Sequence, residues 1–151
     1  MKHIEGNLIT LALAGQFDVI VHGCNCFCTM GRGIAQPIKE AFPQAYAADR
    51  HTTPGDRAKL GTFTWAVVQA PGHTFTVVNA YTQYDYRGAG VKADYEAIRR
   101  VFQAIKQQFS GRRIGYPLIG AGLARGDWPT ISAIIDEVLA GENHTLVHFK
   151  P

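Results

Sequence analysis

The sequence predicts an α/β domain in which a mixed sheet lies between helical layers. Strand-like and helix-like segments alternate along the 151 residues, which is the arrangement that produces α/β folds. Two further strand-like segments follow one another across a short turn, and this indicates an antiparallel pair within the same sheet. With 46% hydrophobic and 18% charged residues, the composition is typical of a globular protein. We therefore expect a single domain over residues 1–151.

Five segments have the composition of strands. "DVIVHG" at 18–23 contains a Val-Ile-Val run, which is typical of a strand covered on both faces. "TFTWAVVQA" at 62–70 and "TFTVVNAYTQY" at 74–84 flank the turn "PGH" and predict an antiparallel hairpin. "RRIGYPLIG" at 112–120 and "HTLVHFK" at 144–150 predict two more short strands.

Helices are indicated by apolar residues at three- and four-residue steps. The segment 91–109 has such a stripe and is predicted to face a core along it. Its members are Val91, Tyr95, Ile98, Phe102, Ile105 and Phe109. The segment 127–139 begins with Asp127 as a capping residue and has a proline two positions later, as helix starts often do. Pro37 fits only among the first four residues of a helix, so another helix is predicted to begin near Gly33 or Ile34.

Charge and cysteine usage exclude several classes of protein. The formal net charge of +3 comes without a dense basic run, so general nucleic-acid binding is weakly supported, whereas a small anionic ligand fits. No apolar run approaches the ~20 residues of a membrane span, and we expect a cytoplasmic protein. Cys24, Cys26 and Cys28 are too closely spaced to wrap a tetrahedral zinc ion. We expect reduced thiols and no metal, with Cys24 and Cys26 as packing residues and the role of Cys28 open.

Two glycine-rich stretches follow predicted strands and precede predicted helices. "TMGRG" at 29–33 comes before the helix that contains Pro37, and "YPLIGAGLARGDWPT" at 116–130 comes before the helix that Asp127 caps. Unpaired N–H groups and the positive end of the helix dipole favour anions at such places. Neither stretch has the spacing of a Walker loop or a dinucleotide-binding fingerprint. The pair therefore indicates two phosphates or one diphosphate, although ordinary tight turns explain each stretch alone equally well.

These motifs resemble the macrodomain, the ADP-ribose-binding module. The resemblance rests on "EGNLIT" near the start, "DVIVHGCN" followed by "MGRGIA", and the late "IGAGLARGDW". Within this superfamily, "IVHGCNCFCTMGRGIA" is similar to the branch of the yeast ADP-ribose 1″-phosphate phosphatase. The late loop is similar to the related branch that removes ADP-ribose from glutamate or from DNA. The resemblance implies a three-layer α/β/α sandwich with a mixed sheet of about six strands, a ligand across its crest, and no cofactor.

The resemblance also implies which residues bind the ligand. Asn7 matches an aspartate that accepts the adenine amino group, and its amide oxygen can still accept, though more weakly. Phe149 matches an adenine-stacking aromatic, with a core phenylalanine as the alternative. Asn25 matches the asparagine that bonds the distal ribose. The two diphosphate loops and the adenine-side positions add Leu8, Ile9, Met30, Gly31, Arg32, Gly33, Ile34, Ile119, Gly120, Ala121, Gly122 and Leu123.

Catalytic residues follow from the phosphatase branch. His22 matches its histidine, and Asp85 is the acid best placed to overhang the same ribose. His22 would act as general acid or base while Asp85 orients water or attacks phosphorus. The alternatives are a histidine hydrogen-bonded inside the sheet and a solvated turn residue. The catalytic lysine of the glycohydrolase branch matches Thr82 and Gln83, and its late-loop acid matches Ala124, so a lysine adduct is not expected.

The sequence therefore predicts a hydrolase that acts at the distal ribose of an ADP-ribose derivative, first of all ADP-ribose 1″-phosphate. Two alternatives stay open: removal of ADP-ribose from modified protein or nucleic acid, and a reader that binds ADP-ribose without turnover. The expected partners are ADP-ribose or ADP-ribose 1″-phosphate, with ADP-ribosylated protein or nucleic acid as further candidates and no membrane.

Overall fold

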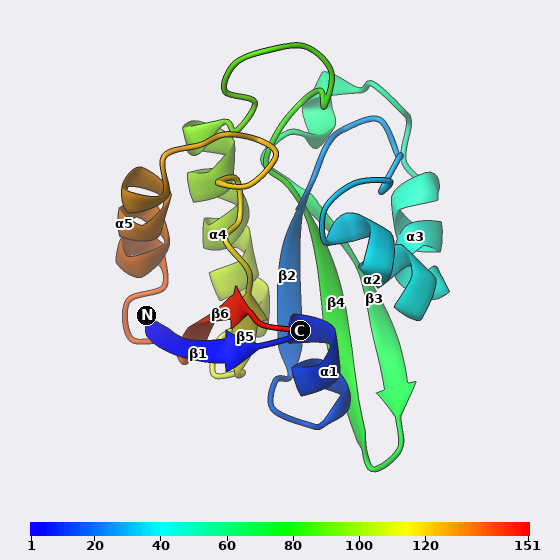
Figure 1. Cartoon of the computed structure of the whole chain (residues 1–151), viewed down its shortest axis with the longest axis vertical. Helices are drawn as coiled ribbons and strands as arrows, with labels where there is room; N and C mark the ends of the chain where they lie inside the picture. The colour runs from blue at the N-terminus through cyan, green and yellow to red at the C-terminus, as the bar shows by residue number, and fades with distance from the viewer.

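Six strands form one mixed sheet in the order β1-β6-β5-β2-β4-β3 (Figure 1). The computed structural model describes all residues, 1–151. The strands are β1 (Lys2–Gly6), β2 (Val19–Cys24), β3 (Phe63–Ala70), β4 (His73–Tyr81), β5 (Ile114–Tyr116) and β6 (His144–Phe149). Every neighbouring pair is parallel except β3 and β4, which form an antiparallel hairpin at one edge. The carboxyl ends of the five mutually parallel strands therefore meet at one edge of the sheet.

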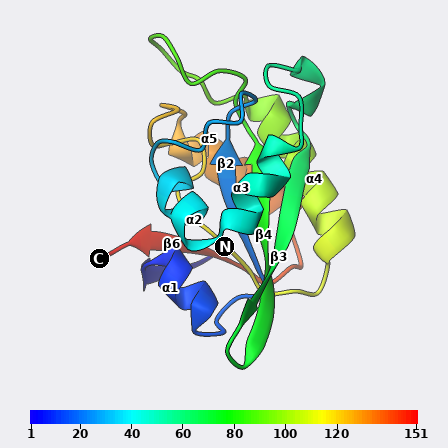
Figure 2. The same cartoon turned by 90° about the vertical axis from the view of Figure 1, so that its right-hand side faces the viewer.

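Helices cover both faces of this sheet. The helices are α1 (Leu8–Leu13), α2 (Ala35–Ala41), α3 (Pro43–Arg50), α4 (Tyr95–Phe109) and α5 (Trp128–Val138), with a 3₁₀ turn, η1, at Arg57–Lys59. One core packs α4 and α5 against the sheet, and a second core packs α1, α2 and α3 against its other face. Figures 1 and 2 show the two helical layers on opposite sides. The predicted three-layer α/β/α sandwich is confirmed.

The helix starts agree with the local sequence signals. Asp127 caps α5, since its carboxylate accepts hydrogen bonds from the backbone N–H and the hydroxyl of Thr130. Asp94 caps α4 by accepting a hydrogen bond from the backbone N–H of Ala97. Val91 is therefore outside the helix and 59% exposed, so its assignment to the apolar stripe was wrong. The helix α2 begins at Ala35 and has Pro37 in its first turn, as the proline predicts.

Some elements were not predicted from the sequence. The strand β1 lies at an edge and four of its five residues are exposed, so it lacks the alternation of a half-buried strand. The short helices α1 and α3 also have no strong apolar stripe. None of the helices combines the length and apolar character that crossing a membrane requires.

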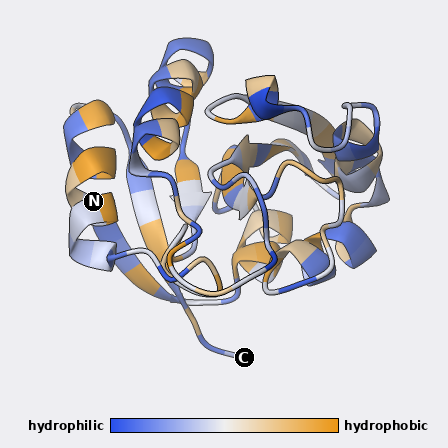
Figure 3. Ribbon diagram, turned by 90° about the horizontal axis from the view of Figure 1, so that it is seen from above, coloured by the Kyte–Doolittle hydropathy of each residue, from blue (hydrophilic) through white to orange (hydrophobic).

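The β3–β4 hairpin points away from the carboxyl ends of the parallel strands. Its turn, at Pro71 and Gly72, lies at the opposite end of the molecule from the loops that follow β2 and β5 (Figure 1). Figure 3 looks down on that loop-bearing edge, with the two helical layers on either side of it. The turn that follows β3 therefore lies away from this edge, whereas the segments that follow β1, β2, β4 and β5 lie at it.

Candidate functional site

A cavity of about 870 Å³ opens at the carboxyl ends of the parallel strands, where ligands bind in most open α/β sheets. The segments that follow β1, β2, β4 and β5 and the end of β6 all contribute to its wall. Of the predicted binding residues, the structure brings together Asn7, Leu8, Ile9, Asn25, Met30, Gly31, Arg32, Gly33, Ile34, Ile119, Gly120, Gly122, Leu123 and Phe149. Ala121 does not line the cavity; it packs against the core formed with α4 and α5.

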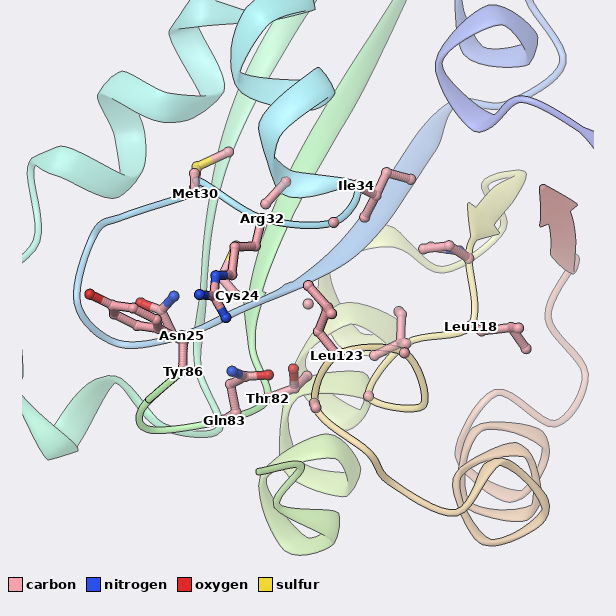
Figure 4. A pocket seen from close by; sticks show the side chains of 18 of the residues that line it. Cys24, Asn25, Met30, Arg32, Ile34, Thr82, Gln83, Tyr86, Leu118 and Leu123 are labelled. Carbon is pink, nitrogen blue, oxygen red and sulfur yellow. The ribbon is translucent and has the colours of Figure 1, made fainter. Parts of the chain in front are cut away.

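The first glycine loop, residues 29–34, joins β2 to α2. The backbone N–H groups of residues 31–34 make no hydrogen bond within the protein. Gly33 has a φ of +56°, a conformation that glycine adopts without a steric penalty. The Arg32 side chain extends from this loop toward Asn25 and Tyr86 (Figure 4). The loop thus presents free donors and one cation to the cavity.

The second glycine loop, residues 118–126, joins β5 to α5. The loop is closed by a 2.6 Å hydrogen bond from the N–H of Gly126 to the carbonyl of Gly120. The N–H groups of residues 122–124 make no hydrogen bond within the protein. The two loops meet at the cavity, because a Cβ added to Gly33 would lie 3.5 Å from Leu123 Cδ1. The cavity is therefore flanked by unpaired backbone donors from both loops.

Asn7 and Phe149 lie at the end of the cavity next to β1 and β6. The Oδ1 of Asn7 accepts hydrogen bonds from the N–H groups of Ile9 and Thr10 and so caps α1. The oxygen that we expected to accept from adenine is thus already used by two donors. Phe149 is 73% exposed, so it is not the core phenylalanine that the sequence also allowed. Its ring is available at the rim of the cavity.

The opposite end of the cavity contains polar side chains from several loops. The amide of Asn25 donates to the hydroxyl of Thr29 and accepts from the N–H of Phe27, which holds the segment after β2 in place. Thr82 and Gln83 follow β4, and Tyr86 lies beyond them (Figure 4). Their position could have been expected, because they come directly after a parallel strand.

Charged residues that the sequence reasoning did not assign also line the cavity. They are Asp49, Lys92 and Arg125. With Arg32, they give the wall three cations and one carboxylate, which favours an anionic ligand. Asp49 in α3 and Lys92 in the loop before α4 belong to no motif quoted above, whereas Arg125 lies within the second glycine loop without having been assigned a role.

The structure does not bring His22 and Asp85 together at the cavity, and neither lines it. His22 is fully buried in β2 and its Nε2 lies 2.7 Å from Oδ1 of Asn79, which is the in-sheet hydrogen bond that we considered as its alternative role. Burial lowers the pKa of His22 to about 4, although the bond to Asn79 opposes this. Asp85 makes a two-pronged ion pair with Arg87, which holds the pKa of its carboxyl well below the usual value.

The three cysteines are free thiols and all are buried. Cys24 and Cys26 belong to the core beneath α1–α3, as expected for packing residues. Burial raises the pKa of Cys24 strongly and that of Cys26 to about 11, so neither is a thiolate near neutral pH. Cys28 donates to the carbonyl of Asp49 and does not line the cavity.

A family model places the chain among known proteins. The Macro domain model matches residues 21–135, which include most of β2, both glycine loops and most of α5. The chain therefore belongs to the Macro domain family, and the resemblance seen in its motifs is confirmed.

Individual relatives agree with this assignment. An uncharacterized 17.5 kDa protein from the tk-vs intergenic region of Enterobacteria phage T4 is 31% identical over 100% of this chain and 97% of its own length. The ADP-ribose glycohydrolase OARD1 of Bos taurus is 28% identical over 91% of this chain and 83% of its own length. The macrodomain of Thermus aquaticus DarG has a similar fold, with a TM-score of 0.73 and 23% identity over 99% of this chain and 97% of its own.

Proposed function

We propose that this macrodomain binds ADP-ribose in the cavity and hydrolyses a bond at the distal ribose. The observation that carries the binding proposal is the pair of glycine loops, which present unpaired N–H groups to one cavity. A diphosphate between the loops satisfies these donors through charge-assisted hydrogen bonds, the stronger kind. The three cations of the wall add to the attraction, and the relative OARD1 is named an ADP-ribose glycohydrolase.

The rest of the ligand follows from the position of the diphosphate. Adenine is placed at Phe149, whose exposed ring offers a stacking surface. The distal ribose is then placed at the opposite end, near Asn25, Thr82 and Gln83. Since its oxygen is engaged in capping α1, Asn7 would contribute its amide N–H groups or its backbone rather than the acceptor that we expected.

Two bonds at the distal ribose are candidates for cleavage. Hydrolysis of the phosphate ester of ADP-ribose 1″-phosphate is the reaction that the motifs around β2 favour, whereas the relative's name favours a glycosidic bond. The positions that match the glycohydrolase lysine and acid carry Thr82, Gln83 and Ala124, all at the cavity, so that mechanism lacks its two reacting groups here. A reader that binds ADP-ribose without turnover is the remaining alternative.

Calorimetry with ADP-ribose, ADP and AMP tests the binding proposal. We expect ADP-ribose to bind with a dissociation constant of about 1 μM, and ADP about tenfold and AMP still more weakly, because each lacks contacts at the distal end. Equal affinity for all three nucleotides would contradict the placement of the distal ribose. No binding of ADP-ribose would contradict the proposed function as a whole.

Turnover assays separate the enzyme from the reader. Phosphate release is measured with ADP-ribose 1″-phosphate, and ADP-ribose release with ADP-ribosylated protein and nucleic acid. The variants His22→Ala and Asp85→Ala are compared with the wild type for both turnover and ADP-ribose binding. Loss of turnover with binding retained would support catalytic roles for these residues. Full activity of both variants would remove them from the mechanism, and no turnover on any substrate by the wild type would favour the reader.

A further inference from the structure

A buried hydrogen-bond chain ends at Asp49, the only acidic side chain that lines the cavity. Tyr81 donates its hydroxyl hydrogen to Oδ1 of Asp49 at 2.7 Å. The hydroxyl of Thr64 lies 3.0 Å from that of Tyr81, and the amide of Asn79 donates to Thr64 at 3.1 Å. Because Tyr81 uses its single hydrogen on Asp49, Thr64 must donate to Tyr81. Each group in this series of hydrogen bonds therefore donates to the next one, and the last, Tyr81, donates to the carboxylate of Asp49.

The same reasoning extends this series of hydrogen bonds from Asn79 to His22. The Oδ1 of Asn79 can only accept, so the Nε2 of His22, at 2.7 Å, carries the hydrogen. A positive charge also lies near: the ammonium of Lys59, which is buried, sits 4.8 Å from the ring centre of Tyr81. Burial raises the pKa of Asp49, while the Tyr81 hydrogen bond and Lys59 oppose the rise. On balance the pKa of Asp49 is raised, so burial outweighs these two groups, which stabilise the carboxylate only in part.

One oxygen of that carboxylate has no partner. The Oδ2 of Asp49 is buried and accepts no hydrogen bond in the protein, although buried polar atoms are nearly always paired. Asp49 is only 1% exposed yet belongs to the residues that line the cavity, so its side chain lies within the wall rather than at the exposed rim. An unpaired carboxylate oxygen in that position lacks one hydrogen-bond donor.

The neighbouring wall is also suited to a sugar. Cys24, Asn25 and Thr29 line the same cavity as Asp49, and the carbonyl of Asp49 accepts from the thiol of Cys28 in the loop above. The cations of the cavity, Arg32, Lys92 and Arg125, lie on the glycine loop and on the irregular segments after β4 and β5. The cavity wall thus holds three cations that attract an anion and one carboxylate, which attracts a neutral donor and repels a phosphate.

We propose that Asp49 Oδ2 is an acceptor site for the distal ribose, where it takes a hydrogen bond from a sugar hydroxyl. This inference rests on the proposed binding of ADP-ribose in the cavity and adds a residue that no motif assigns. Asp49 is a binding and positioning residue in this role. Tyr81, Thr64 and Asn79 orient its carboxylate through the chain of hydrogen bonds.

The variant Asp49→Asn tests the proposal with ADP-ribose and ADP as probes. The substitution keeps the size of the side chain and removes its charge. A lost hydrogen bond to a charged group corresponds to about a tenfold weaker affinity for ADP-ribose. The affinity for ADP, which has no distal ribose, should stay within about twofold and shows that the variant is folded. Asp56→Asn, which changes a capping residue of η1 outside the cavity, is the matched control and should change neither affinity.

Unchanged ADP-ribose affinity in Asp49→Asn, or an equal loss for ADP-ribose and ADP, would overturn the inference. If the variant does not fold, a crystal structure of the wild type with ADP-ribose decides. A ribose hydroxyl at hydrogen-bonding distance from Oδ2 supports the inference, and a water molecule alone at Oδ2 overturns it. Failure of the wild type to bind ADP-ribose would instead contradict the proposed function, so the two failures are distinguishable.

Discussion

In the first glycine loop, a methyl group added to Gly31 would find its nearest neighbour 3.7 Å away, at the backbone oxygen of Thr29. In the second loop, a methyl group added to Gly126 would lie 2.5 Å from the backbone oxygen of Gly120 and 2.8 Å from Ile131. Gly126 is therefore required by the packing of the protein itself. Gly31 has free space on the protein side, so the packing of the protein itself does not require a glycine there.

The second loop contains both kinds of glycine. A Cβ on Gly120 would come within 3.0 Å of Ile131, whereas one on Gly122 would meet nothing within 4 Å. The GxG spacing thus combines a structural glycine, Gly120, with an open glycine, Gly122, by which we mean one where an added Cβ would have free space. A glycine-rich motif alone does not say which glycine serves the fold and which serves the ligand.

The largest expected effect tests the packing glycine. Gly126→Ala should lower the free energy of unfolding by about 3 kcal/mol, because the overlap with backbone cannot be relieved by a side-chain rotation. Gly122→Ala is the control in the same loop and should change it by less than about 1 kcal/mol. Both are measured by urea denaturation. Equal stability of the two variants would contradict the distinction between the glycines.

The next largest effect is a pH dependence of the free energy of unfolding, which arises from His22 in the strand that precedes the first loop. His22 in β2 has its pKa lowered by burial to about 4, whereas an unfolded chain has about 6.5. The unfolded state therefore binds more protons between these values, and the stability that neutral His22 contributes is lost as pH falls below 6.5. Between pH 7 and pH 5 this amounts to about 2 kcal/mol. The free energy of unfolding of His22→Gln, measured by urea denaturation, should therefore fall by about 2 kcal/mol less than that of the wild type between pH 7 and pH 5. The same pH dependence in both proteins would contradict a neutral buried His22.

The open glycines should affect binding rather than folding. Gly31→Ala and Gly122→Ala each place a methyl group where the diphosphate is proposed to approach the backbone. We expect about tenfold weaker ADP-ribose binding, or 1.4 kcal/mol, in calorimetry, with a thermal midpoint close to that of the wild type. If only one of them weakens binding, the diphosphate contacts one loop rather than both.

The smallest effect concerns the cation of the first loop. Arg32→Gln should weaken ADP-ribose binding by about two- to fivefold at low salt, because a partly solvated charge contributes little, and the loss should shrink at high salt. Arg57→Gln removes an exposed arginine that lies over the Tyr84 ring outside the cavity and serves as the control. The same loss in both variants would indicate a general effect of net charge.

Local sequence signals predicted much of this molecule. Pro37 placed the start of α2, Asp127 placed that of α5, and the "PGH" turn placed the β3–β4 hairpin. Each of these signals acts through neighbours in the chain, so one sequence suffices to read it. The two glycine loops also lie at the cavity, because strand carboxyl ends meet at one edge of a parallel sheet.

What the sequence did not reveal depends on contacts between distant residues. Asp49 lines the cavity, and its carboxylate accepts a hydrogen bond from Tyr81, which is 32 residues away in the sequence. The parallel register of β2 and β4 places His22 opposite Asn79. The His22 ring is hydrogen-bonded to the Asn79 side chain and does not line the cavity. Lys92 and Arg125 belong to irregular loops whose path no periodicity predicts. Such residues are assigned only once the strands are paired.

The single antiparallel edge has a practical consequence. Because β3 runs against its neighbour, the tip at Pro71 and Gly72 lies on the side of the molecule remote from the two glycine loops. An added Cβ on Gly72 touches nothing within 4 Å. A fluorescent dye or an affinity tag inserted at this tip would leave the opening of the cavity unobstructed. Surface immobilisation through that point presents every molecule in one useful orientation.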